Sequence, residues 1–121
     1  MSGSPHVLDE SPEAYDAWIQ SLQQDLYSAE HLEPLTTFLS AAGNATRLRM
    51  LYVLWHTSEL CVGDLAKLFQ ITHPAVSNHL KKLRQASLVE SRREAQRIYY
   101  SISENNRFVR VLLHLFEEPH D

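Results

Sequence analysis

Apolar residues recur at spacings of three and four along most of this chain, which is the period of amphipathic α-helices. The first such stripe follows Ser11, Pro12 and Glu13, and this run is typical of a helix start. It combines an N-cap residue, a proline for the first turn and an acid near the positive end of the helix. We expect residues 1–10 to form a mobile N-terminal arm. The stripe of the first predicted helix consists of Tyr15, Trp18, Ile19, Leu22 and Leu26.

The next segment predicts two more helices. One spans Leu32 to Ala42 and has Pro34 in its first turn, and Gly43 with Asn44 ends it. Asn44 or Thr46 can cap the helix that follows. The expected buried stripe of that helix is Leu48, Leu51, Tyr52 and Trp55.

Two short helices then follow with only a turn between them. The first runs from Cys61 to Phe69, and the second has Thr72 as its cap and Pro74 in its first turn. Two short helices joined by three or four residues form a helix-turn-helix unit. The apolar positions of the second helix are Val76, Leu80 and Leu83.

After Ser87 the hydrophobic period changes to two. Ile98, Tyr100 and Ile102 alternate with more polar residues, which predicts a half-buried strand, and residues 88–92 can pair with it. A hairpin after a helix-turn-helix is a wing. The expected fold class is therefore mainly α (α+β): a winged helix-turn-helix with five to six helices and a two-stranded β-hairpin wing.

The last predicted helix, from about Asn105 to Glu118, is apolar on more than one face, because seven of the nine residues 108–116 are hydrophobic. The surplus apolar face predicts a homodimer through this helix and the helix of residues 15–26. The alternative is a helix wrapped by the N-terminal segment of its own chain. We expect residues 11–121 to form a single winged-helix domain whose terminal helices make the dimer interface.

Composition agrees with one globular domain, since 121 residues of which 44% are hydrophobic can bury a core. A single cysteine excludes an internal disulfide and favours a reducing compartment. The first six residues have neither a basic start nor an apolar core, and no apolar run approaches the roughly 20 residues of a membrane span. We expect a cytoplasmic protein with no membrane partner.

Charge is distributed unevenly along the chain. Residues 1–46 carry −7, residues 47–110 carry +6 and the last eleven residues carry −3, although the net charge is −4. A basic body joined to an acidic segment is common in proteins that bind nucleic acid. The alternative from charge alone is a solvated basic face.

Four ordered blocks between residues 38 and 102 resemble the ArsR/SmtB family of winged-helix transcriptional repressors. They read FLSAAGNATRLRML, ELCVGDLA, HPAVSNHLKKLR, and Leu88-Val89 through Arg92-Arg93-Glu94 to Ile98-Tyr99-Tyr100. The resemblance implies a dimeric repressor that binds a double-stranded DNA operator, expected to be an inverted repeat, and is released by an effector. The chain departs from the family at Ala45, where proline often stands, and at Ala95-Gln96, where the wing tip often has glycine.

Helical geometry turns the polar side of the second helix of the motif outward, opposite the stripe that begins at Val76. Asparagine can bond adenine bidentately there, and the wing arginines suit phosphates or the minor groove. His79, nearer the buried edge, is either a packing residue or a phosphate donor, and Tyr99 is expected to share a strand face with the arginines. The candidate DNA-binding residues are His73, Pro74, Ala75, Ser77, Asn78, His79, Lys81, Lys82, Gln85, Arg92, Arg93, Arg97 and Tyr99.

The candidate effector is a divalent transition metal such as zinc, and no cofactor is expected to be needed for folding. Cys61 and Asp64 resemble the family's thiolate and carboxylate metal position, but zinc usually takes four ligands. Alternatively, Cys61 is a redox-sensitive thiol or a small core residue, and Asp64 is a helix-start carboxylate. A second candidate set of metal ligands is Glu104, His114, Glu117 and His120. The alternative is that these residues are an acidic terminus with incidental histidines.

Enzyme motifs are absent from the sequence: it has no Gly-rich phosphate loop, no H-E-x-x-H and no recognisable nucleophile elbow. We therefore expect a regulator and not an enzyme. The alternatives to an effector-released repressor are a metal-independent winged-helix regulator and a protein-interaction module that has lost the family's metal site.

Overall fold

The computed structural model describes residues 11–117. These residues fall into two compact units, and the division between the units follows Pro34. The arm predicted for residues 1–10 and the candidate ligand His120 lie outside the described residues. A single domain over residues 11–121 stays a prediction.

The first unit contains α2 (Pro12–Ser28), which begins where the sequence predicts. The Ser11 hydroxyl accepts a hydrogen bond from the backbone N–H of Ala14 at 3.0 Å, so it caps the helix as expected. None of the residues of α2 is buried within the described chain. The apolar stripe along α2 is thus largely exposed.

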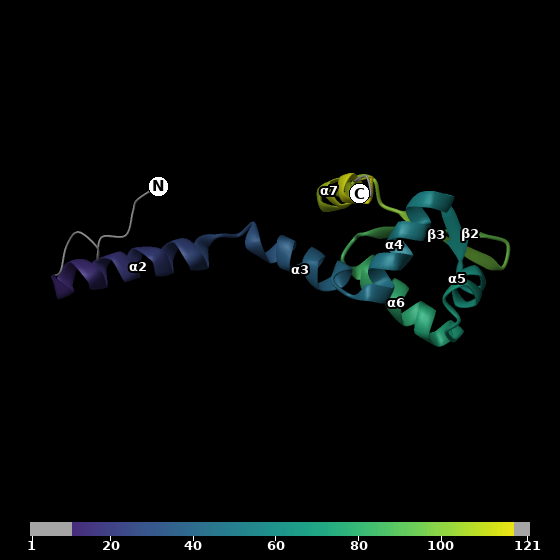
Figure 1. The fold of residues 1–121 in the computed structure, drawn as a ribbon, viewed down its shortest axis with the longest axis horizontal. Helices are drawn as coiled ribbons and strands as arrows, with labels where there is room; N and C mark the ends of the chain where they lie inside the picture. The colour runs from purple at the N-terminus through teal and green to yellow at the C-terminus, as the bar shows by residue number, and fades with distance from the viewer. Residues whose placement is uncertain (1–10, 118–121) are drawn as a thin grey trace, which may run out of the picture. The chain divides into compact units, whose positions relative to one another are not determined.

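The second unit is a winged helix-turn-helix (Figure 1). The unit boundary falls within α3 (Leu32–Ala42). The sequence predicts five to six helices, and the described residues form six. None of these six helices is long and apolar enough to cross a membrane. The remaining elements are α4 (Ala45–Thr57), β1 (Glu59–Cys61), α5 (Val62–Phe69), α6 (His73–Gln85), β2 (Val89–Glu94), β3 (Arg97–Ile102) and α7 (Arg107–Phe116).

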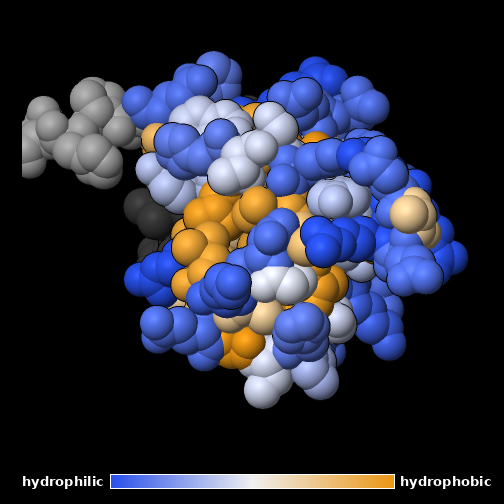
Figure 2. Space-filling view, turned by 90° about the vertical axis from the view of Figure 1, so that its right-hand side faces the viewer, coloured by the Kyte–Doolittle hydropathy of each residue, from blue (hydrophilic) through white to orange (hydrophobic). Residues whose placement is uncertain are grey.

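The core of this unit lies between α4, α5, α6 and the sheet, with the first turns of α7 against it. The buried side chains of this core are aliphatic. Close packing within the one chain excludes solvent from them. Figure 2 shows one face of the molecule, on which hydrophilic side chains surround a smaller hydrophobic area. The largest fully buried residues are Met50, Leu51, Leu54, Leu65, Val76, Leu80, Leu83, Leu88 and Val109.

The sheet has three strands and not the two predicted. β3 lies in the middle, with β2 on one side and β1 on the other, and both pairings are antiparallel. β1 covers only Glu59–Cys61, and so short a segment shows no alternation from which it could be predicted. Through β1 the wing is joined by hydrogen bonds to the segment that leads into α5.

The inward face of α4 also differs from the prediction. Asn44 caps the helix as expected, and Leu51 is buried, but Leu48 and Tyr52 are 37% and 40% exposed. Met50 and Leu54 take the core positions instead. Because α4 has apolar residues on two sides, its periodicity alone does not identify the side that faces the core.

Candidate nucleic-acid interface

The N-cap of α6 and its buried apolar stripe determine which side of the helix faces solvent. The Thr72 hydroxyl accepts a hydrogen bond from the N–H of Ala75 at 3.2 Å, and the predicted stripe of three aliphatic residues is fully buried. This orientation turns the opposite side to solvent. Among the predicted DNA-binding residues of α6, Ala75 and His79 are half-buried, and the exposed ones are His73, Pro74, Ser77, Asn78, Lys81, Lys82 and Gln85.

The turn before α6 is as short as predicted. Gln70 adopts a left-handed conformation with φ of 56°, and its N–H donates to the Ala66 carbonyl. The N–H of Ile71 donates to the same carbonyl at 3.2 Å, so the last turn of α5 is closed. Only three residues, 70–72, therefore separate the end of α5 from the start of α6, which is the connection of a helix-turn-helix.

In the wing, the Arg92 side chain interacts with two other residues of the same sheet. Its Nε donates to both carboxylate oxygens of Glu59, at 3.1 and 2.9 Å, its Nη2 also bonds that carboxylate, and its guanidinium lies 5.0 Å from the centre of the Tyr99 ring. The hydrogen bonds from Arg92 hold the pKa of Glu59 below its usual value, and the same pairing raises the pKa of Arg92. This ion pair is exposed, so it is worth little stability.

The strand register separates the three wing arginines. Arg92 pairs with Tyr99 and Glu94 pairs with Arg97, so Arg92, Arg97 and Tyr99 lie on one face of the sheet. Arg93 pairs with Ile98 and lies on the other face. The expectation that Tyr99 shares a face with all three arginines is wrong for Arg93, because side chains alternate along a strand.

Arg93 and Arg97 are both exposed, and neither forms an ion pair with a residue of the described chain. Arg97 nevertheless acts electrostatically on Asp64 and helps to lower the pKa of that carboxyl. Among the three wing arginines, the guanidinium of Arg93 therefore has the fewest partners within residues 11–117.

Sequence reasoning missed one buried side chain beneath the interface, Arg47 in the first turn of α4. Its Nη1 lies 3.3 Å from Nδ1 of His79, so it contacts α6 from inside the protein. The two residues are 32 positions apart in the sequence, and no spacing signal connects them. His79 is thus partly a packing residue, which is one of its two predicted roles.

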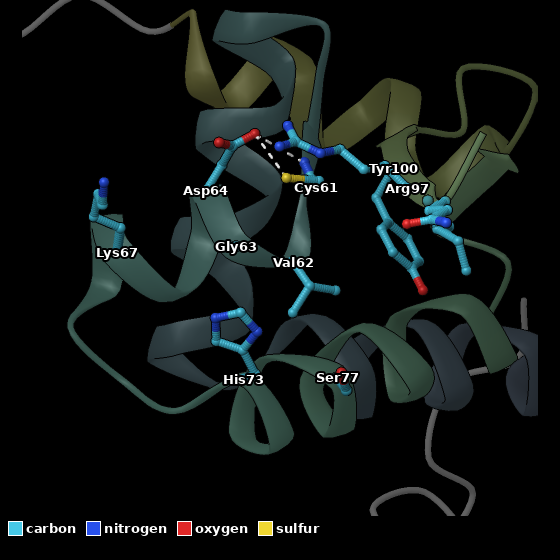
Figure 3. A pocket seen from close by; sticks show the side chains of 11 residues that line it. Cys61, Val62, Gly63, Asp64, Lys67, His73, Ser77, Arg97 and Tyr100 are labelled. Carbon is cyan, nitrogen blue, oxygen red and sulfur yellow. Dashed lines mark hydrogen bonds between the residues drawn. The ribbon is translucent and has the colours of Figure 1, made fainter. Parts of the chain in front are cut away.

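A cleft of about 700 Å³ separates α5, the first half of α6 and the wing (Figure 3). Lys67 of α5, His73 and Ser77 of α6, and Arg97 and Tyr100 of β3 line it. Cationic and hydroxyl groups from three elements thus meet beside the exposed face of α6. Such groups are the usual donors to phosphate oxygens.

Cys61 and Asp64 stand at one end of this cleft and bond to each other (Figure 3). One carboxylate oxygen of Asp64, Oδ2, accepts from the backbone N–H of Cys61 at 3.1 Å and from its thiol at 3.2 Å. These two bonds lower the pKa of Asp64, the backbone bond contributing most. Asp64 therefore acts as a helix-start carboxylate for α5, which is the structural alternative considered for it.

The second candidate metal set is only partly within the described chain. Nδ1 of His114 lies 4.0 Å from a carboxylate oxygen of Glu117, and both side chains are exposed. Over residues 11–117, no three histidine, cysteine or acidic side chains come together as a metal site would require. Cys61 with Asp64 supplies two donors where zinc usually takes four, so the described residues of one chain do not fit a zinc site.

Comparison with known proteins agrees with this fold. Residues 44–91 match the family model described as "Bacterial regulatory protein, arsR family". The chain is 31% identical to the transcriptional repressor SmtB homolog of Synechocystis sp., over 94% of this chain and 82% of the relative. It is 46% identical to the nodulation protein NolR of Rhizobium meliloti, over 61% of this chain, and spans only 60% of that relative.

Among solved structures, the chain resembles the homodimeric winged helix-turn-helix DNA-binding domain Mb0332 from Mycobacterium bovis. The TM-score is 0.62 and the identity 30%, over 73% of this chain and 76% of that one. The family model covers α4, the helix-turn-helix and the first half of β2, and the SmtB homolog aligns along nearly the whole chain. The chain therefore belongs to the ArsR/SmtB family of winged-helix transcriptional regulators.

Proposed function

We propose that this protein is a homodimeric repressor that binds an inverted-repeat operator in duplex DNA, in the cytoplasm. The observation that carries the proposal is α6, whose apolar side is fully buried while its other side presents polar and basic side chains to solvent. A helix exposed in this way after a short turn suits the major groove. The SmtB homolog is named a repressor and Mb0332 a homodimer, and both support the proposal.

Within this interface the residues have different roles. Asn78 of α6 reads a base, because an amide can pair bidentately with adenine. Arg93 contacts the DNA backbone, because its guanidinium has no ion-pair partner among the described residues. The cleft between α5, α6 and the wing receives the neighbouring phosphates through Lys67, His73 and Arg97.

Selection of duplexes from a random library by the full chain tests this proposal. We expect the enriched sequences to contain an inverted repeat with half-sites about one helical turn apart. Binding should weaken steeply as salt rises, because phosphate contacts release counterions. Failure to enrich any sequence, or no duplex binding at low salt, would reject a sequence-specific repressor and favour a protein-interaction module.

Control by an effector is a separate part of the proposal. An effector that releases the operator must bind the DNA-free protein more tightly than the complex. Zinc, nickel and cobalt, titrated into the free protein and into the complex, test whether the effector is a divalent metal, with Cys61→Ser as the ligand variant. A metal effector would bind the two forms with different affinities. Equal affinities, or no uptake, would leave a metal-independent regulator.

A further inference from the structure

Arg47 is the one charged residue that is buried in the described chain, with 9% of its surface exposed. Its Nε donates to the Ala41 carbonyl at 2.7 Å and its Nη2 donates to the Ser40 carbonyl at 3.4 Å. Both acceptors belong to the last turn of α3, whose carbonyls lack partners within the helix. With Nη1 beside His79, a single side chain of α4 connects the end of α3 to the recognition helix.

The chemistry of this contact fixes the state of the His79 ring. A guanidinium has five N–H donors and no acceptor, so Nδ1 of His79 must accept the hydrogen bond. Nδ1 can accept only when it carries no proton, and a neutral ring then carries its proton on Nε2. The contact with Arg47 therefore selects the neutral Nε2–H form of His79.

The surroundings of His79 favour the same form. Burial lowers the pKa of His79 from 6.5, and the charges of Arg47 in α4 and Lys82 in α6 lower it further. No acid of the described chain opposes these two charges at the ring. The imidazole is therefore neutral at pH 7, and protonating it would place a second donor against Arg47.

The remaining donor of the ring is not sealed from solvent, because no buried side-chain nitrogen or oxygen of the described chain lacks a hydrogen-bond partner. Among the described residues none accepts a hydrogen bond from Nε2, and the ring is half-buried, between exposed Asn78 and buried Leu80 in the sequence of α6. A phosphate oxygen accepts from a neutral N–H as it does from a cation. A neutral donor, however, releases no counterion when it binds.

We infer that Arg47 is a positioning residue for operator binding, which holds His79 as a neutral Nε2–H donor to the DNA backbone and ties α6 to the end of α3. This inference rests on the proposed function. A purely structural role for Arg47, as a partner of the α3 carbonyls, would affect folding only. It would leave the protonation state of His79 and the salt dependence of DNA binding unchanged.

The state of the ring can be measured on the free protein, without DNA. ¹⁵N NMR of the labelled full chain between pH 5 and 8, with His79→Asn to assign the signal, reports which nitrogen carries the proton. We expect the Nε2–H form throughout the neutral range. Arg47→Gln should raise the pKa of His79 and mix the two neutral forms. An Nδ1–H ring or an imidazolium in the wild type at pH 7 would overturn the inference.

The contribution to DNA binding is measured with His79→Asn, whose amide leaves an acceptor near the Nδ1 position but removes the Nε2–H donor. We expect binding to the selected operator about tenfold weaker, the cost of one hydrogen bond to a charged group, with an unchanged salt slope. Lys82→Ala is the matched control on the same helix, and loss of its charge should lower the slope by about one. A fall of about one in the slope for His79→Asn would mean a cationic histidine and would overturn the inference.

A double variant tests whether Arg47 acts through His79. Arg47→Gln should weaken operator binding when residue 79 is His, and should weaken it clearly less when residue 79 is Asn, because the donor that Arg47 positions is then absent. Fully additive effects would contradict the positioning role. If the wild type binds no duplex, the proposed function fails while the NMR result stands. If the wild type binds and His79→Asn binds as tightly, only this inference fails.

Discussion

Helices α6 and α7 are both amphipathic and belong to the same unit, yet only α6 has its apolar side fully covered. In α6 the three aliphatic residues of the stripe are inaccessible to solvent. In α7 Val109 and Leu112 are buried, but Val111 and Leu115 remain 61% and 60% exposed. This difference suits two kinds of partner: the polar surface of α6 suits a charged ligand, and the apolar surface of α7 suits another protein surface.

The apolar surface of α7 continues onto neighbouring elements of the same unit. Leu39 of α3 and Leu48 of α4 line a shallow groove of about 200 Å³ with Val111 and Leu115. The exposure of Leu48, which the helical period of α4 does not explain, thus fits a face covered by a second copy of the chain. Substitutions in α6 and α7 can separate this proposed dimer face from the proposed DNA face of α6.

The largest effect is expected from Leu115→Glu. A carboxylate buried at the proposed dimer interface is costly, so the variant should sediment as a monomer at micromolar concentration. Operator affinity should then fall by roughly a hundredfold or more, because the two half-sites are no longer bound together. Leu68→Glu is the matched control for sedimentation, since Leu68 of α5 is 56% exposed and lies away from α7 in the sequence. A Leu115→Glu variant that stays dimeric would remove α7 from the interface.

Replacing one leucine by alanine in α6 and one in α7 should distinguish a core position from a position in the proposed dimer interface. The two variants should differ in how their thermal stability depends on protein concentration. Leu80→Ala in α6 should lower the free energy of unfolding by about 2–5 kcal/mol, because it leaves a cavity in the core. Leu115→Ala should instead change the dependence of the thermal midpoint on protein concentration, since it weakens association. Calorimetry at several concentrations checks both. A concentration-independent loss for Leu115→Ala would place its side chain in the core of one chain.

On the DNA face, Asn78→Ala should cost about 1–3 kcal/mol of discrimination at one base position, if the amide pairs with adenine. Binding to a panel of operators with single base changes measures this. Loss of affinity that is equal for every operator would mean that Asn78 contacts the backbone and that α6 does not read the sequence at this residue.

The smallest effects concern the wing. Arg93→Ala should weaken binding to all duplexes alike and lower the salt slope by about one. Arg92→Ala should change the slope less, because the Arg92 guanidinium is already bonded to Glu59. Salt titrations of the two variants compare them directly. Equal slopes would show that the Glu59 pair opens when DNA binds.

Much of the fold could be predicted from the sequence because the decisive signals are local. Ser11 and Thr72 cap the helices that they were expected to cap, and the spacing of residues 76, 80 and 83 gives the inward face of α6. The residues of the DNA face follow from that spacing. Their individual contacts with DNA stay predictions.

Features that depend on distant parts of the chain could not be predicted. β1 becomes a strand because Leu60 pairs with Tyr100, and the inward side of α4 depends on what packs against it. The contact between Arg47 and His79 joins residues from different helices, so no periodicity indicates it. Cys61 and Asp64 lie three residues apart in the sequence, but that spacing does not show that their bonds to each other serve the start of α5.

The central claim is that a dimer reads duplex DNA with α6. Sedimentation velocity of the full chain with a labelled operator from the selection, with a scrambled duplex of equal length as the control, tests it most directly. We expect two chains per operator at physiological salt and little binding to the scrambled duplex. We also expect Asn78→Ala to keep the dimer but lose much of this preference. Equal binding of both duplexes, or one chain per operator, would contradict the account.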